Sequence, residues 1–164
     1  RRQRQMCIRD RNQRPFDGNG IYRQRYSERH RGGEEMITDE VYQMDVLNLA
    51  FLGDAVYELL VREMISTKNT RVNELHKEAI HFVSANSQCA DLDVIWEDLD
   101  EREQTIVKRA RNKRLHAPKH TKPQVYTLAT GFEALFGALY LSGEKERIAG
   151  LFEKIKENKY GNNR

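Results

Sequence analysis

Two acidic residues of this 164-residue chain stand in almost wholly apolar surroundings. Asp54 lies in the middle of an apolar stretch, and Glu133 is the only acidic residue between Glu103 and Glu144. A buried carboxylate without a partner is costly, so each acid must be paired, bound to a metal or placed at the rim of a cleft. Asp54 and Glu133 are therefore the first candidates for chemistry.

A glycine accompanies each acid: Gly53 precedes Asp54, and Gly137 follows Glu133 by four residues. A helical glycine costs roughly 1 kcal/mol relative to alanine, and it is tolerated where another backbone must approach closely. The pattern predicts two helices that cross at their glycines and present both acids together. Carboxylate oxygens suit Mg²⁺, which keeps several waters and takes few protein carboxylates. Two unrelated carboxylates, each satisfied by local hydrogen bonds, are the alternative.

Two further side chains on the first helix could assist these acids. Glu58 follows Asp54 by four residues and therefore lies on the same helix face. Asn48, a turn and a half before Asp54, could support the acids through a contact with a metal-binding side chain, without binding the metal itself. An Asp–Glu pair on one helix face is also typical of a solvated helix edge, and that interpretation stays open for this segment taken alone.

A basic segment separates the two acids in the chain. Residues 108–122 contain seven Lys or Arg, two His and no acidic residue. A segment of one charge sign is typical of contact with nucleic-acid phosphates, although a charge run can also be merely solvated. Such cations would follow the backbone of the nucleic acid instead of reading its bases, which fits duplex RNA. The candidate RNA-binding residues are Lys108, Arg109, Arg111, Asn112, Lys113, Arg114, Lys119 and Lys122.

Helices are the elements that must position these residues. Apolar residues recur at three- and four-residue steps over 44–63, which predicts a long buried helix. No stretch alternates with period two, so we predict an all-α fold of about five to seven helices. Phe132, Phe136 and Tyr140, at four-residue spacing, could form an apolar seam between subunits or could equally belong to the core. Further helices are expected near 72–82, 85–96 (with Ser84 as a cap), 101–111, 125–142 and 145–156.

Composition narrows the classes of function. The chain is 38% hydrophobic and 32% charged, which allows one soluble domain with a modest core. No apolar run approaches the roughly 20 residues needed to span a bilayer, so we expect a cytoplasmic protein without membrane contact. The two cysteines, Cys7 and Cys89, argue against a disulfide framework or a thiolate metal site.

The net charge of +3 is distributed unevenly. Residues 1–35 hold ten Arg and five acidic residues, whereas the rest of the chain holds 18 basic and 20 acidic residues. The first segment has few aliphatic residues and no sustained period, so we expect a disordered or extraneous basic tail, with Met36 as a candidate start. The catalytic domain is expected over 36–157, and 158–164 is expected to be a second tail.

These motifs, taken together, resemble the catalytic domain of the ribonuclease III family. The segment from Leu52 to Glu58 resembles its signature helix, and the segment from Phe132 to Gly137 resembles its second acidic motif. The resemblance covers roughly 44–157 and narrows to the Mini-III ribonucleases, the bacterial members without a double-stranded RNA-binding domain. It rests also on the segments 73–77, 83–88, 108–112 and 118–119.

The resemblance implies a helical homodimer in which each protomer brings one acidic site to a groove that holds a duplex. Asp54 and Glu133 would be the catalytic metal ligands for Mg²⁺, and His76 and Lys77 join the RNA-binding candidates. The implied function is metal-dependent endonucleolytic cleavage of double-stranded RNA, with precursor 23S ribosomal RNA as the substrate. A catalytically silent RNA-binding relative and a helical interaction protein that touches no nucleic acid are the alternatives.

The acidic pattern is smaller than that of the larger ribonuclease III enzymes. Those enzymes carry glutamates seven and four residues before the aspartate, where this chain has Leu47 and Ala50. The acid expected three residues before Glu133 is Thr130. The sequence therefore predicts a site with two carboxylates, as in the Mini-III members.

Overall fold

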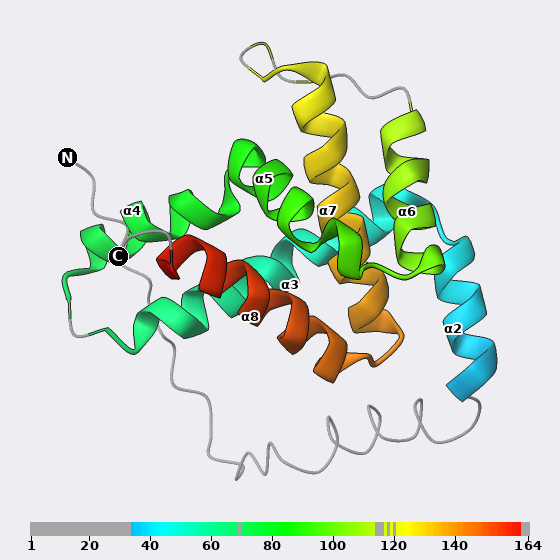
Figure 1. The fold of residues 1–164 in the computed structure, drawn as a ribbon, viewed down its shortest axis with the longest axis horizontal. Helices are drawn as coiled ribbons and strands as arrows, with labels where there is room; N and C mark the ends of the chain where they lie inside the picture. The colour runs from blue at the N-terminus through cyan, green and yellow to red at the C-terminus, as the bar shows by residue number, and fades with distance from the viewer. Residues whose placement is uncertain (1–33, 69, 114–116, 118, 120, 162–164) are drawn as a thin grey trace, which may run out of the picture. The chain divides into compact units, whose positions relative to one another are not determined.

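The structure, a computed structural model, describes residues 34–161 except 69, 114–116, 118 and 120 (Figure 1). Within these residues every regular element is a helix, which confirms the all-α fold and the expected number of helices. The tail expected over 1–35 lies almost wholly outside the described residues. The elements are α2 (Glu34–Gln43), α3 (Val46–Ser66), α4 (Val72–Val83), α5 (Ala85–Ile95), the 3-10 helix η1 (Trp96–Asp98), α6 (Glu101–Asn112), α7 (Pro123–Leu141) and α8 (Lys145–Gly161).

Capping side chains stand at the starts of α3, α5 and α6. Asp45 accepts a hydrogen bond from the backbone N–H of Leu47 at 2.8 Å and begins α3. Ser84 caps α5, as predicted. Asp100 and Glu103 form a reciprocal capping box at α6, in which each side chain accepts from the other residue's backbone N–H.

Helix α7 lies at the centre of the helical domain. It packs against α3, α5, α6 and α8 (Figure 1). Every residue from Ala129 to Leu139 is buried except Glu133, which is half-buried. A helix that is apolar on nearly all sides must be covered on all sides, and this explains why four helices surround α7.

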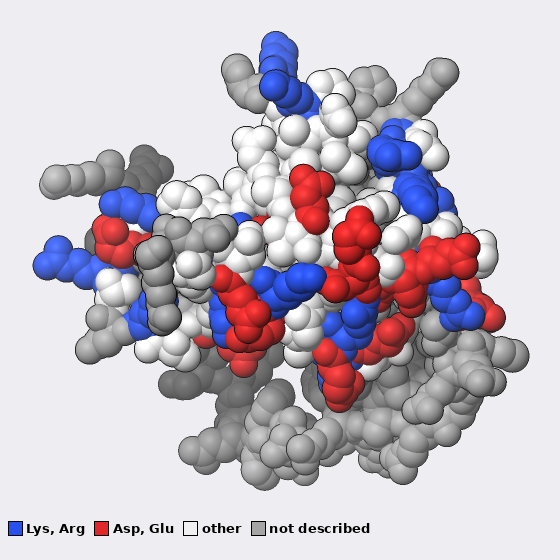
Figure 2. All heavy atoms as spheres, viewed as in Figure 1, with Lys and Arg blue, Asp and Glu red and all other residues white. Residues whose placement is uncertain are grey.

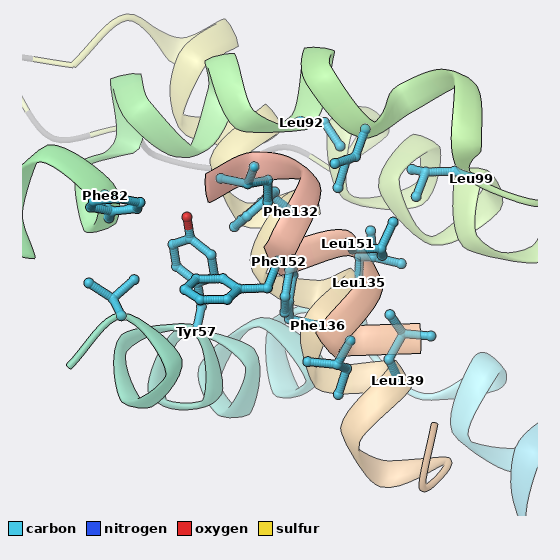
Figure 3. Close-up of a cluster of buried hydrophobic side chains, with 14 of the residues drawn as sticks. Tyr57, Phe82, Leu92, Leu99, Phe132, Leu135, Phe136, Leu139, Leu151 and Phe152 are labelled. Carbon is cyan, nitrogen blue, oxygen red and sulfur yellow. The ribbon is translucent and has the colours of Figure 1, made fainter. Parts of the chain in front are cut away.

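Four aromatic rings form the middle of the core (Figure 3). Tyr57 of α3 meets Phe132 and Phe136 of α7 edge to face, with ring centroids 4.8 and 5.2 Å apart. Phe152 of α8 completes the group at 5.9 Å from Tyr57. Phe132 and Phe136 are therefore core residues and not a seam between subunits, whereas Tyr140 is 37% exposed.

Two features of the fold were not predicted. Helix α2 was not expected. Arg109 of α6 stabilises its position, because the guanidinium donates hydrogen bonds to the carbonyls of Tyr42 and Met44. Helix α8 continues to Gly161, so the part of the expected tail from 158 onward that is described is helical. Both features depend on contacts with residues distant in the sequence. None of the described helices is both long and apolar enough to cross a membrane.

Candidate metal and nucleic-acid site

Helices α3 and α7 cross at two glycines. A Cβ atom on Gly53 would overlap the carbonyl oxygen of Glu133 and would lie 2.6 Å from the backbone nitrogen of Gly137. A Cβ atom on Gly137 would overlap the carbonyl oxygen of Leu49. The two backbones therefore touch directly, as the pairing of glycines with acids predicts.

This crossing brings the two predicted carboxylates together. Asp54 follows Gly53 on α3, and Glu133 contributes its own backbone to the contact on α7. Burial raises the pKa of Glu133 to about 7, and the charge of Asp54 adds to that rise. The pKa of the more exposed Asp54 is also raised, first by loss of water at the helix crossing and then by the charge of Glu58. The arrangement holds two like charges close together, which favours a bound cation.

Gln88 of α5 is the third polar side chain at this position, and sequence reasoning did not single it out. It is only 1% exposed, and its hydrogen bonding to Glu133 opposes the rise of that carboxyl's pKa. Sequence reasoning assigned the segment 83–88 a family resemblance and a possible helix cap, formed by Ser84 together with Gln88, but no role at the acids. Gln88 could have been identified from the sequence as a polar residue on the buried face of a predicted helix, because buried polar groups usually have a partner.

The other positions near the acids supply no further carboxylate to the pair. Glu58 forms an ion pair with Arg62 at 2.5 Å. Asn48 is exposed, and it points about 120° away from Asp54 around the axis of α3. Ala50 is buried, and the Thr130 hydroxyl donates to the carbonyl of Tyr126. In the part of the chain that is described, no three His, Cys, Asp or Glu residues gather as a metal-binding group.

This donor set fits a small hard cation. Two carboxylates with raised pKa values gain from a positive charge between them, and a buried amide donor lies beside one of them. Mg²⁺ retains several waters and takes one or two protein carboxylates, so a site with two acids suffices. Zn²⁺ sites in proteins are built mainly from His nitrogen and Cys sulfur, and none of these three residues is His or Cys.

Two of the candidate RNA-binding residues form contacts within the protein that stabilise the fold. Arg109 joins α6 to the end of α2 through backbone carbonyls. Lys113 forms an ion pair at 2.5 Å with Asp45, the cap of α3. These two cations stabilise the start of the helix that carries Asp54, and much of their donor capacity is used within the protein.

The remaining described candidates are available at the surface. Lys108 lies over the ring of Trp96, at 5.9 Å from its centroid, and is exposed. Lys77 pairs with Glu74 at the exposed surface of α4. Lys and Arg side chains lie near the upper ends of α6 and α7, apart from the acidic groups across the middle of this face (Figure 2). Arg114 lies outside the described residues, whereas the exposed residues Arg111, Asn112, Lys119, Lys122 and His76 lie within them.

An apolar face of α3 was also missed by the sequence reasoning. Phe51 is 86% exposed and Leu59 is 64% exposed, eight residues apart on one side of the helix. A groove of about 560 Å³ runs beside them, lined by Leu52, Val56, Leu60 and Tyr140 among others. Large exposed apolar groups in one area are typical of a protein interaction surface. The apolar period of this segment predicted a buried helix, but it did not indicate that one apolar side of α3 is exposed.

Comparison with known proteins identifies relatives over the same part of the chain. The Ribonuclease III domain family matches residues 47–144. The Mini-ribonuclease 3 of a Thermoanaerobacter species is 45% identical over 122 residues, which cover 73% of this chain and 86% of that protein. The Mini-ribonuclease 3 of Symbiobacterium thermophilum is 46% identical over 109 residues, covering 65% and 84%. A solved protein from Fusobacterium nucleatum superposes with a TM-score of 0.66 at 32% identity, covering 71% of this chain and 95% of that one.

Proposed function

The chain belongs to the ribonuclease III family and is an endoribonuclease, and from this premise we propose that it cleaves double-stranded RNA with Mg²⁺ held by Asp54 and Glu133. The observation that carries the proposal is the crossing of α3 and α7 at Gly53 and Gly137, with the two acids close enough for the charge of Asp54 to raise the pKa of Glu133. Residues 36–157 are the proposed catalytic domain.

The two acids have different surroundings and therefore different tasks. Glu133 is half-buried beside Gln88 and supplies a fixed anionic ligand. Asp54 is exposed, so it would be the ligand more accessible to the RNA. The bound Mg²⁺ would supply a water of lowered pKa and stabilise charge that develops on the phosphate. Glu58 raises the pKa of Asp54 and adds negative potential, and Asn48 is left as a supporting candidate on α3.

Four exposed cations and the exposed amide of Asn112 bind the RNA in this proposal. Lys108, Arg111, Asn112, Lys119 and Lys122 come from α6, from the connection to α7 and from the start of α7. They would contact phosphates along the duplex, and such contacts carry little sequence information. The remaining candidates are His76 and Lys77 on α4, together with Arg109, Lys113 and Arg114.

We further propose precursor 23S ribosomal RNA as the substrate and the cytoplasm as the place of action. The Mini-ribonuclease 3 relatives and the motifs of this chain support the same assignment within the family. The described domain offers dispersed exposed cations, which suit recognition of an RNA duplex by its shape and backbone.

The decisive test is incubation of the purified full chain with a duplex that carries a precursor stem. Cleavage on both strands is expected with Mg²⁺, and none is expected with a chelator. Ca²⁺ in place of Mg²⁺ is expected to support binding with little cleavage, because it binds oxygen ligands in a looser geometry. Cleavage that persists in the chelator would contradict the metal mechanism, and binding without any cleavage would favour the silent RNA-binding alternative.

A homodimer is part of the proposed function, and we place Phe51 in its interface. Phe51 is the most exposed large apolar side chain among the described residues. Replacement of Phe51 by Glu is expected to weaken self-association at least about thirty-fold, because a central aromatic anchor contributes 2 kcal/mol or more. Sedimentation velocity over a range of protein concentrations measures the change. Ile80→Glu is the matched control, since Ile80 is similarly exposed on α4. A monomeric wild type, or an unchanged Phe51→Glu dimer, would refute this interface.

The rate of cleavage is expected to depend on pH through Glu133. Because its pKa is raised to about 7, metal binding needs a proton to leave, and the rate at low Mg²⁺ should fall roughly ten-fold per unit below pH 7. Saturating Mg²⁺ should move this acidic limb to lower pH, since a bound cation favours the carboxylate. Rate profiles at two Mg²⁺ concentrations test this, and a limb that stays in place would count against Glu133 as a ligand.

The metal-free protein should show the opposite trend in stability. A folded-state pKa above the unfolded value means that the folded protein binds the proton more tightly. The contribution of Glu133 is therefore present at acidic pH and is lost as the pH rises through about 7. Unfolding in urea with a chelator present measures this dependence.

A further inference from the structure

Gln88 is a buried polar residue whose hydrogen-bonding capacity is not fully satisfied. Its side chain is 1% exposed, and its amide nitrogen has no hydrogen-bond partner of regular geometry among the described residues. A buried donor left in this condition is unfavourable, and most buried polar groups in proteins are paired. The position therefore carries a cost that an apolar residue of the same size would avoid.

The group that the Gln88 amide approaches is the carboxyl of Glu133. Gln88 exerts a hydrogen-bonding effect on Glu133, and only the amide nitrogen of a glutamine can donate to a carboxylate. The two residues come from different helices, α5 and α7, which pack against each other. The amide therefore lies close to the carboxyl of Glu133 without forming a hydrogen bond of regular geometry.

The turn of α5 that carries Gln88 is held firmly on both sides. Lys159 of α8 donates to the Ser87 hydroxyl at 2.6 Å and pairs with Asp91 at 2.7 Å. The Tyr57 hydroxyl of α3 donates to the other oxygen of Asp91 at 3.0 Å. One residue before Gln88 and three residues after it, the helix is tied to α8 and α3. These ties fix where the Gln88 amide can reach.

We propose that Gln88 is a positioning residue that orients the Glu133 carboxylate for the metal, with Lys159 and Asp91 holding α5 in place behind it. The inference rests on the proposed function, because it needs Glu133 to be a metal ligand. The amide donates to one carboxylate oxygen and leaves the other for the cation. Partners of metal ligands are known to set ligand orientation and metal affinity in this way.

The competing explanation is that Gln88 serves only the packing of α5. The two explanations differ in what a leucine at this position does. If Gln88 served packing alone, Gln88→Leu would leave metal affinity unchanged. If Gln88 positions Glu133, the leucine removes a costly buried donor, so the melting temperature in chelator stays equal or rises, while metal affinity falls.

The test is titration of the full chain with Mn²⁺ in the absence of RNA, with free Mn²⁺ followed by electron paramagnetic resonance. Gln88→Leu is expected to weaken Mn²⁺ binding about ten- to a hundred-fold. Gln88→Met, an unbranched apolar replacement, should weaken it to a similar degree and is the second variant if leucine does not fit. Mn²⁺ affinity within two-fold of wild type in a folded variant would overturn the inference.

Two further variants separate the possible failures. Leu92→Ala removes a buried side chain from the same helix, so it should lower the melting temperature without changing Mn²⁺ affinity per folded molecule. A loss of affinity in Leu92→Ala equal to that in Gln88→Leu would overturn the inference. Asp54→Asn should greatly reduce Mn²⁺ binding. If Asp54→Asn also binds Mn²⁺ normally, the proposed metal site itself is wrong; if only Gln88→Leu binds normally, the inference alone fails.

Discussion

Asp54→Asn is expected to lower the rate of RNA cleavage at least about a thousand-fold. Asparagine keeps the shape of the side chain but removes the negative charge, and a metal ion contributes several kcal/mol to such a reaction, each 1.36 kcal/mol being a factor of ten in rate. The fold should survive because Asp54 is exposed. Its loss also removes one cause of the raised pKa of Glu133.

Single-turnover cleavage of the duplex stem, together with a gel-shift measurement, separates chemistry from binding. Asp54→Asn should bind the duplex with nearly wild-type affinity, because phosphate contacts by Lys and Arg provide that affinity. Asp93→Asn is the matched control, an exposed aspartate on α5 that should cleave within two-fold of wild type. If Asp54→Asn were to retain full activity, the acidic pair could not be the catalytic site.

Gly53→Ala is expected to have the largest effect on stability. Its Cβ atom would overlap the carbonyl oxygen of Glu133 and lie 2.7 Å from the carbonyl carbon, and both atoms belong to a backbone that cannot rotate away. Alanine would otherwise favour the helix by roughly 1 kcal/mol, so the steric conflict must exceed this gain. We expect the free energy of unfolding to fall by about 3 kcal/mol or more.

Gly150→Ala on α8 is a sharp control for this prediction. A Cβ atom there meets no atom within 4 Å, so alanine should stabilise the protein by up to about 1 kcal/mol. Urea unfolding of the two variants measures both values. Opposite signs are expected for the same chemical change. A Gly53→Ala protein as stable as wild type would mean that α3 and α7 do not cross at this residue.

The crossing could be predicted from sequence because its evidence is local. Gly53 adjoins Asp54, and Gly137 stands one helical turn after Glu133, so each helix carries both its contact point and its acid. Capping residues such as Ser84 likewise mark helix starts within a few positions. For these features the residues that determine the structure are close together in the chain.

Other features depend on partners that lie far apart in the chain. Arg109 belongs to a basic segment that predicts RNA contact, yet its donors go to carbonyls at the end of α2. Lys159, in the expected tail, pairs with Asp91 of α5 and extends α8. Gln88 acquires its relation to Glu133 only when α5 packs against α7. Composition and periodicity carry no information about such pairings, which depend on tertiary packing.

The crossing of α3 and α7 also has a consequence for how the protein is made. During synthesis α3 emerges first, and α7, which carries Glu133, follows only after α4, α5 and α6. Closing so long a loop is opposed by chain entropy, and contacts this distant in sequence slow folding. A nascent or truncated chain that lacks α7 would hold Asp54 without its partner. The nuclease is therefore expected to remain inactive on the ribosome until α7 has emerged and packed against α3.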